Sequence, residues 1–353
     1  MTRHRGMDTS RPVRLALIGA GVIGRKHLET IAAEPSAELV AIADPAPGTP
    51  DLATANDVPC FTDAAELLAA TGPDGVVIAT PTEYHLEPVL AALAAGAHVL
   101  VEKPITATDA EAAEVVAAAE QAGRHVLVGQ HRRHNPVLSR AREVLNDGSI
   151  GDLVTVNGHW TLLKEGRGYW NPDWRKRRGA GPVLTNLIHE FDTLRHLCGE
   201  IASVQAEITN SVRGWEKEDA AAIVLTFASG AIGTFTLSDA TPSPWAWELA
   251  TGENPAFPPS FRNTHRFNGT LGALEFPDLA IWRYATDPGW HFPLECQPIA
   301  VEQSDAYARQ CAHFCAVVRG QADPLVSAAD GARSLRAVTA VFEAAETGRR
   351  VTL

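Results

Sequence analysis

Cysteine, methionine, positive charge and long apolar runs are all scarce in this chain. It has five cysteines in 353 residues, an odd number typical of a reducing compartment, and we expect a cytoplasmic protein. No apolar run reaches the roughly 18 residues that a membrane span needs, so no membrane contact is expected. The formal net charge of -12 disfavours nucleic acid as a partner.

Two further absences narrow the possibilities. Residues 1–12 are polar and basic without an apolar core, so we expect a disordered lead-in and not a secretory signal. Cys311 and Cys315 lie four residues apart, but no second pair accompanies them. We therefore expect thiols in a helix core and no metal site.

The first third of the chain reads as an α/β domain. The length favours two domains, and residues 13–134 alternate short apolar runs with helical patterns. Strands are expected at 13–19, 38–44, 75–80, 98–101 and 125–129. Helices are expected at 24–33, 62–70, 84–95 and 108–121. This order predicts a Rossmann domain with a doubly wound parallel sheet.

The sequence pattern changes in residues 135–353. Alternating strands are expected at 152–163, 204–211, 220–227, 231–237 and 272–276. Helices are expected only at 186–197, 307–318 and 328–347, with an ordered proline-rich loop at 242–261. We predict a C-terminal α+β domain with a large, mainly antiparallel open sheet.

A glycine motif follows the first expected strand. Gly19-Ala-Gly21-Val-Ile-Gly24 opens the first helix, which is the context that a dinucleotide-binding fingerprint requires. The first two glycines let the backbone turn and approach a pyrophosphate, and the third lets helix and strand pack closely. The helix N-terminus favours phosphate binding, and Val22 and Ile23 complete the predicted cofactor loop.

Asp44 ends the second expected strand, 20 residues after Gly24. A carboxylate there accepts hydrogen bonds from both ribose hydroxyls and repels a 2′-phosphate. No Arg or Lys follows within 45–50 to offset that repulsion. The cofactor is therefore predicted to be NAD and not NADP.

Lys103 lies between Glu102 and Pro104 at the end of an apolar strand. Ligands of doubly wound sheets bind just beyond the carboxyl ends of the strands, so a cation there is a candidate for chemistry. A surface lysine that ends a strand is the alternative on position alone.

Several motifs in order resemble one family, the Gfo/Idh/MocA oxidoreductases. They are the glycine fingerprint, 79–85 (Ala-Thr-Pro-Thr-Glu-Tyr-His), Glu102-Lys-Pro104 and Gly179-Ala-Gly-Pro followed by His189-x-x-Asp192. The family includes inositol dehydrogenases and glucose–fructose oxidoreductase, and the resemblance extends from about residue 13 to 353. It implies a tightly held nicotinamide cofactor and oxidation or reduction at a sugar or cyclitol carbon. It also implies a homodimer or homotetramer built through the C-terminal sheet.

The resemblance also implies roles for individual residues. Thr80, Pro81 and His85 match the turn that lines the cofactor, and Glu102 with Lys103 matches the pair beside the nicotinamide, where the bond before Pro104 is usually cis. Residues 130–136 match the segment that enters the substrate domain, where His131 or Arg133 reaches the nicotinamide or the substrate.

The expected chemistry needs a base for the hydroxyl proton. His189 is the best candidate, because imidazole titrates near neutral pH. Asp192 lies on the same helical face and either binds a substrate hydroxyl or orients the ring; a surface or capping charge is the alternative. Lys103 stabilises the developing alkoxide or relays the proton. A structural role for His189 also stays open.

One position departs from the family pattern. The family has an aspartate four residues before the histidine, where this chain has Thr185 followed by Asn186. Thr185 can hydrogen-bond but carries no charge, so Asn186 or another group takes part of the role, or the proton path differs. Both residues stay in the predicted substrate site.

Aromatic and basic residues gather before the second glycine motif. Trp160 and Lys164 are predicted to bind substrate, and Trp174 to contact the cofactor, because flat aromatics suit sugar faces and nicotinamide. Core packing or an interface explains the aromatics equally well. The run 175–178 is interpreted as a solvated loop or a clamp for cofactor phosphate.

These observations predict an NAD-dependent dehydrogenase that oxidises a secondary hydroxyl of a sugar, sugar derivative or cyclitol. A family member that cleaves glycosidic bonds by transient redox is one alternative. An NAD-binding sugar sensor without turnover is another. The sequence does not name the substrate.

Overall fold

The chain forms two compact units. The structure, a computed structural model, describes residues 11–166 and 168–353. Unit 1 comprises the residues up to His134 together with Asp305–Leu335, and unit 2 comprises Asn135–Ser304 together with Arg336–Leu353. The sequence predicts 305–335 in the second domain, whereas here this segment packs with the first. Most of the predicted lead-in, 1–12, lies outside the described residues, but Arg11 pairs with Asp74 at 2.7 Å.

Unit 1 contains a parallel sheet of the predicted Rossmann type. Its strands run in the order β3–β2–β1–β4–β5–β6, so the order reverses between β1 and β4, where ligands of such sheets bind. The strands are β1 (Val13–Ile18), β2 (Ala37–Ala43), β3 (Cys60–Phe61), β4 (Gly75–Ile78), β5 (His98–Val101) and β6 (Val126–Val128). The central strands β1, β4 and β5 are almost wholly buried, as their apolar sequences require.

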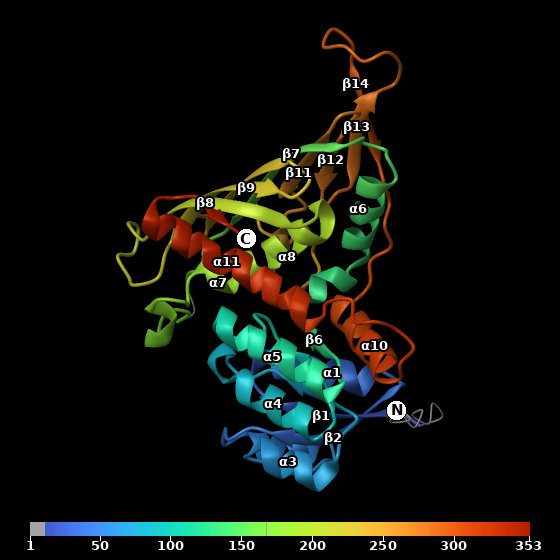
Figure 1. Cartoon of the computed structure of the whole chain (residues 1–353), viewed down its shortest axis with the longest axis vertical. Helices are drawn as coiled ribbons and strands as arrows, with labels where there is room; N and C mark the ends of the chain where they lie inside the picture. Colours follow the sequence, from blue (N-terminus) through green and yellow to red (C-terminus); the bar gives the residue numbers. More distant parts are fainter. Residues whose placement is uncertain (1–10, 167) are drawn as a thin grey trace. The chain divides into compact units, whose positions relative to one another are not determined.

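Helices flank this sheet (Figure 1). They are α1 (Val22–Ala33), α2 (Thr49–Ala55), α3 (Ala64–Thr71), η1 (Thr82–Tyr84), α4 (Leu86–Ala94), α5 (Asp109–Ala122), η2 (His131–His134) and α10 (Ala306–Val318). The predicted capping box of α5 is present, since Thr108 accepts from the Glu111 N–H and Glu111 accepts from the Thr108 N–H. Gly123 ends that helix in the left-handed conformation, also as predicted.

Helix α10 completes the core of unit 1. It packs against α1 and η2, and Phe314 reaches the start of β4, where a Cβ on Gly75 would lie 2.9 Å from the ring. Cys311 and Cys315 are buried in this core, in agreement with their predicted packing role. Burial of this apolar face explains why α10 joins unit 1 despite its distance in sequence.

Unit 2 contains a mixed, mostly antiparallel sheet, as predicted. Its strands run in the order β14–β13–β12–β11–β7–β10–β9–β8–β15. The bounds are β7 (Leu153–Thr161), β8 (Ile201–Thr209), β9 (Ala220–Phe227), β10 (Ile232–Ser238), β11 (His265–Gly269), β12 (Ala273–Phe276), β13 (Ala280–Tyr284), β14 (Leu294–Pro298) and β15 (Val351–Thr352). The pair β7–β10 is parallel, and the long connection between the two strands contains α7 (Pro182–Thr185), α8 (Leu187–Cys198), β8 and β9.

The helices of unit 2 lie mainly on one face of this sheet (Figure 1). They are α6 (Pro136–Asn146), η3 (Asp173–Lys176), α7 (Pro182–Thr185), α8 (Leu187–Cys198), α9 (Trp247–Ala250) and the later part of α11 (Ala328–Thr347). Helix α8 packs on β7, and α6 packs on α8. On β9 and β10 buried and exposed residues alternate, and Val224 and Ile232 remain about half exposed. Assembly through this sheet stays a prediction.

Within the described residues, no helix is long and apolar enough to cross a membrane.

Candidate functional site

Of the three glycines in the fingerprint, Gly21 has open space around it, whereas Gly19 and Gly24 are closely packed. Gly19 has φ +93°, and a Cβ there would lie 2.6 Å from the Ala79 carbonyl carbon. A Cβ on Gly24 would lie 2.0 Å from the Gly19 oxygen, so helix and loop pack in direct contact. A Cβ on Gly21 would meet nothing within 4 Å. The backbone at Gly21 is thus open to a pyrophosphate, as the fingerprint predicts.

The N-terminus of α1 fits an anion. Gly21 is its N-cap, and Val22–Ala33 receives no side-chain cap and has no acidic residue in its first turn. The helix dipole and the first N–H groups therefore favour a phosphate there. Val22 is 87% exposed and Ile23 39% exposed, although both are apolar. A dinucleotide bound over the glycine loop would cover these two apolar side chains.

Asp44 follows β2 and braces the same loop. Its Oδ2 accepts a hydrogen bond from the Ala20 N–H at 2.6 Å, and its Oδ1 accepts one from the Ala46 N–H at 2.7 Å. The carboxylate thus lies beside the glycine loop and is only partly buried. It is oriented at the point where the ribose of a bound dinucleotide is expected.

The turn after β4 is tied to the turn after β5 by His85. The Nε2 of His85 lies 3.0 Å from the Thr80 carbonyl, and its Nδ1 lies 2.9 Å from the Pro104 carbonyl. Burial lowers the pKa of this imidazole, although both carbonyls favour its protonated form. Pro81 precedes η1 at the exposed edge of this turn. His85 therefore orders the loop that contains Lys103.

Lys103 directly follows β5 at the carboxyl edge of the sheet. The Lys103–Pro104 bond is cis, as the family motif predicts. The side chain of Lys103 is partly buried, and its backbone N–H donates to Glu102 Oε2 at 3.2 Å. Gly19 and Lys103 thus follow β1 and β5 at the same edge of one sheet.

A buried hydrogen bond between Glu102 and His27 lies next to Lys103. Glu102 is 7% exposed, and its Oε1 lies 2.8 Å from Nε2 of His27, which is 3% exposed. Burial opposes ionisation of Glu102, but the His27 hydrogen bond and the charges of His27 and Lys103 outweigh it and lower the pKa. A Cβ on Gly129 would lie 3.0 Å from this carboxylate. Glu102 is therefore an ionised group that orders the Lys103 backbone.

His131 and Arg133 both lie in η2 and make contacts within unit 1. The His131 ring stacks on Tyr307 with centroids 4.4 Å apart. Burial and the charges of Arg132 and Lys103 lower the pKa of His131 well below its usual value. The Arg133 guanidinium lies 2.6 Å from Asp330. Contact of either residue with cofactor or substrate stays a prediction.

The predicted base lies on α8 in unit 2. His189 is 6% exposed and Asp192 1% exposed, and their spacing puts both on one side of the helix. The His189 N–H donates to the Asn186 carbonyl at 3.0 Å, so the first turn of α8 links the two residues.

Thr185, Asn186 and Lys164 form one polar group ahead of α8. The Asn186 Oδ1 accepts from Lys164 Nζ at 2.6 Å and from the Thr185 hydroxyl at 2.9 Å. The Thr185 hydroxyl also lies 2.9 Å from the Gly181 carbonyl. The hydroxyl of Thr185, four residues before His189, thus donates to the Asn186 amide oxygen, which also accepts from the Lys164 ammonium group.

The two predicted tryptophans differ in their accessibility. Trp160 is 1% exposed, and its Nε1 donates to Glu248 at 2.9 Å, so it is a core residue of β7. Lys164 Nζ lies 5.3 Å from the centroid of its ring. Trp174 is 58% exposed on η3 beside Arg175, so its face is available to a ligand.

Family models match both halves of the chain. The oxidoreductase family with an NAD-binding Rossmann fold matches residues 13–130, and the GFO/IDH/MocA C-terminal domain matches residues 138–275. The chain belongs to the Gfo/Idh/MocA oxidoreductase family. Its N-terminal part is accordingly an NAD-binding Rossmann domain, and the structure gives that cofactor an open glycine loop, an uncapped helix N-terminus and Asp44.

Named relatives span nearly the whole chain. An inositol 2-dehydrogenase of Rhizobium meliloti (strain 1021) is 25% identical over 97% of this chain and 99% of its own length. A 1,5-anhydro-D-fructose reductase of Ensifer adhaerens is 28% identical over 95% and 97%. The WlbA dehydrogenase of Bordetella pertussis, solved with NADH and UDP-GlcNAcA, has a TM-score of 0.80 at 24% identity, covering 97% of this chain and 99% of that one. The last likeness concerns the fold.

His27 is a site residue that sequence reasoning missed. It lies three residues after Gly24 on the inward side of α1, in the helix that also begins the cofactor loop. A histidine one turn after a glycine fingerprint, on a buried helical face, was the available signal. Its role follows from the contact with Glu102, which the sequence does not show.

Proposed function

We propose that this protein is an NAD-dependent dehydrogenase that oxidises a secondary hydroxyl of a sugar, sugar derivative or cyclitol. The observation that supports this most is Lys103 at the carboxyl edge of the sheet that forms the dinucleotide loop, with its backbone ordered by the buried Glu102–His27 pair. A lysine in that place can act on the oxygen of a substrate held beside the nicotinamide.

Each protein group has a part in the reaction. When bound, NAD accepts the hydride from the carbinol carbon, which is the cofactor's own chemistry. Lys103 donates a hydrogen bond to the reacting oxygen and stabilises negative charge there. His189 takes the hydroxyl proton as general base. Asp192, Asn186, Thr185 and Lys164 hold the other hydroxyls of the substrate.

The neutral group at Thr185 changes the proton chemistry of this member. The Asn186 amide oxygen accepts from Lys164, and neither Thr185 nor Asn186 can act as a base. The proton chemistry is therefore assigned to Lys103 and His189. Sugars and cyclitols fit these residues because ammonium and amide N–H groups donate hydrogen bonds to substrate hydroxyls, while amide and hydroxyl oxygens accept from them.

A substrate screen tests the proposal. The purified protein is incubated with NAD and a panel of sugars, sugar acids and cyclitols, and NADH absorbance is followed. We expect NADH formation with at least one polyol. Saturable NAD binding without turnover on any member of the panel would favour the sensor or the transient-redox alternative.

A second experiment tests the cofactor preference. Asp44→Ala removes the carboxylate that is expected to bind the ribose hydroxyls and to repel a 2′-phosphate. NAD affinity should fall by about tenfold, while NADP affinity falls less or rises. Equal weakening of both cofactors would contradict the NAD assignment.

A further inference from the structure

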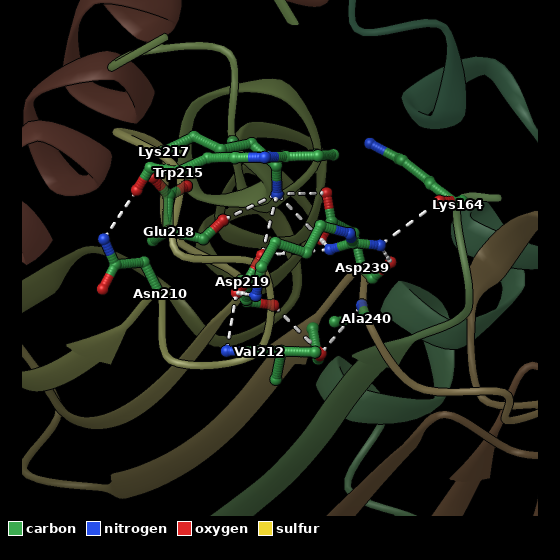
Figure 2. Close-up of polar contacts among 12 residues, drawn as sticks. Lys164, Asn210, Val212, Trp215, Lys217, Glu218, Asp219, Asp239 and Ala240 are labelled. Carbon is green, nitrogen blue, oxygen red and sulfur yellow. Dashed lines mark hydrogen bonds and ion pairs between the residues drawn. The ribbon is translucent and has the colours of Figure 1, made fainter. Parts of the chain in front are cut away.

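A largely buried cluster of charges lies beside the polar group of Lys164 and Asn186. It consists of Arg213, Lys217, Asp219 and Asp239 and is called here the Lys217 network. Lys217, Asp219 and Asp239 are each 0% exposed. Lys217 Nζ lies 2.9 and 3.0 Å from the two Asp239 oxygens and 3.4 Å from Asp219 (Figure 2).

Arg213 completes the network and neutralises it. Its Nη1 lies 2.7 Å from Asp239 and 3.0 Å from Asp219. Two cations and two carboxylates thus share one site, and the Trp170 ring centroid lies 4.6 Å from the Arg213 guanidinium and 5.0 Å from Lys217 Nζ. Burying charges is costly unless each one is paired, and here each carboxylate accepts from both cations.

The network holds the backbone of Lys164 on both sides. The Lys164 N–H donates to the Asp239 carbonyl at 2.9 Å. The Lys164 carbonyl accepts from Arg213 Nη2 at 3.2 Å and from the Trp170 indole at 2.7 Å. The start of the Lys164 side chain is therefore fixed, and its ammonium group reaches Asn186 from there.

Glu218, which follows Lys217 in the sequence, connects the same network to the segment before α8. Its carbonyl accepts from Lys217 Nζ at 2.9 Å, and its Oε1 accepts from the Val183 N–H at 2.8 Å. Glu218 is 5% exposed, and a Cβ on Gly181 would lie 2.2 Å from its Oε1. The Gly179-Ala-Gly-Pro motif thus lets this carboxylate hold α7, which leads into Asn186 and His189.

We propose that the Lys217 network and Glu218 are positioning residues that set the geometry of Lys164, Asn186 and His189 for the substrate. This inference rests on the proposed function and adds groups that do not touch the substrate themselves. The network determines the position of Lys164 through its backbone, and Glu218 determines the start of α8 through Val183.

Glu218 provides the sharpest test, because its substitution leaves the four charged residues of the Lys217 network in place. Glu218→Ala removes the acceptor for Val183, Glu218→Gln keeps it, and Glu216→Ala makes a similar truncation at an exposed neighbour. Hydrogen exchange of peptides covering 160–190, NAD affinity, KM and kcat are measured for all three. Lys217→Met, which removes the central ammonium group, is measured in the same way where it folds.

The expected result is local. In Glu218→Ala exchange rises within 179–189, and kcat/KM falls by about tenfold or more, because small displacements of reacting groups are costly. NAD affinity stays within about twofold, since the glycine loop belongs to unit 1. Glu218→Gln and Glu216→Ala resemble the wild type in exchange and in kcat/KM.

Two results would overturn the inference. One is unchanged exchange in 179–189 and unchanged kcat/KM in Glu218→Ala. The other is a parallel loss of NAD binding, stability and turnover, which indicates a general structural role. If the wild type oxidises no polyol, the proposed function fails, and the exchange data alone still decide whether Glu218 orders this loop.

Discussion

The hydrogen bond between His27 and the Glu102 carboxylate can be tested by removing its donor. His27→Leu removes the donor at 2.8 Å and leaves a carboxylate that is 7% exposed. Breaking a buried pair from one side costs about 3–5 kcal/mol. We expect His27→Leu to lower the free energy of unfolding by about 3 kcal/mol, the lower end of that range. The reason is that Glu102 still accepts a hydrogen bond from the Lys103 N–H at 3.2 Å. For a unit of this size the Tm should fall by about 6–12 °C.

The pH dependence identifies the cause of that loss. The pKa of Glu102 is lowered in the folded wild type, so its contribution is present above the unfolded value of about 4.3 and is lost as pH falls through the folded value. His27→Leu removes the hydrogen bond that lowers this pKa, so the pKa of Glu102 should rise in the variant. The Tm difference between the two proteins should therefore be largest near neutral pH and shrink toward about pH 4.

Thermal unfolding followed by circular dichroism between about pH 4 and 8 measures both quantities. His125→Leu is the matched control, because it makes the same change at an exposed histidine of unit 1. A Tm that does not change in His27→Leu, or a difference that is equal at all pH values, would refute the reasoning.

The remaining predictions concern the cofactor loop and the second glycine motif. Gly24→Ala should abolish NAD binding and lower the Tm, because its Cβ would lie 2.0 Å from the Gly19 oxygen. Gly21→Ala should weaken NAD binding at an unchanged Tm, since its Cβ meets only open space; calorimetric titration separates the two. Burial raises the pKa of Glu218, so its ionisation destabilises the fold as pH rises through that value. Glu218→Gln, which can still accept from Val183, should raise the Tm, and more so at higher pH; a gain that grows toward acid pH would contradict this.

The Rossmann unit was largely predictable because its signals are local. The glycine fingerprint, the alternation of strands with helices and the capping box at Thr108 each act within a few residues. The cis bond before Pro104 followed from the family motif alone. The short elements α2 and β3 escaped prediction, since seven and two residues give too little periodicity.

The support of the site was not predictable, because it is made by contacts distant in sequence. His27 meets Glu102 across 75 residues, and Lys217 meets Asp239 across 22. Nothing near Lys217 in the sequence shows that its ammonium group is fully buried. Trp160, in contrast, was predicted from the sequence to bind a sugar face. It lies in the core, where Glu248 accepts a hydrogen bond from its indole.

The packing of α10 with unit 1 was also not predictable, because it depends on contacts distant in sequence. Its periodicity predicts a helix at 307–318 but not the partner of its apolar face. That partner is α1 and the start of β4, more than 200 residues earlier in the chain. Apolar burial is non-directional, so the sequence of one helix does not identify what covers it.

The most direct test of the central claim is turnover by Lys103→Ala on a polyol that the wild type oxidises. NAD affinity is measured alongside, because the glycine loop and Asp44 are unchanged in this variant. The account predicts a loss of kcat of about 10²-fold or more, with an unchanged Kd for NAD. An oxidation rate equal to that of the wild type would contradict it.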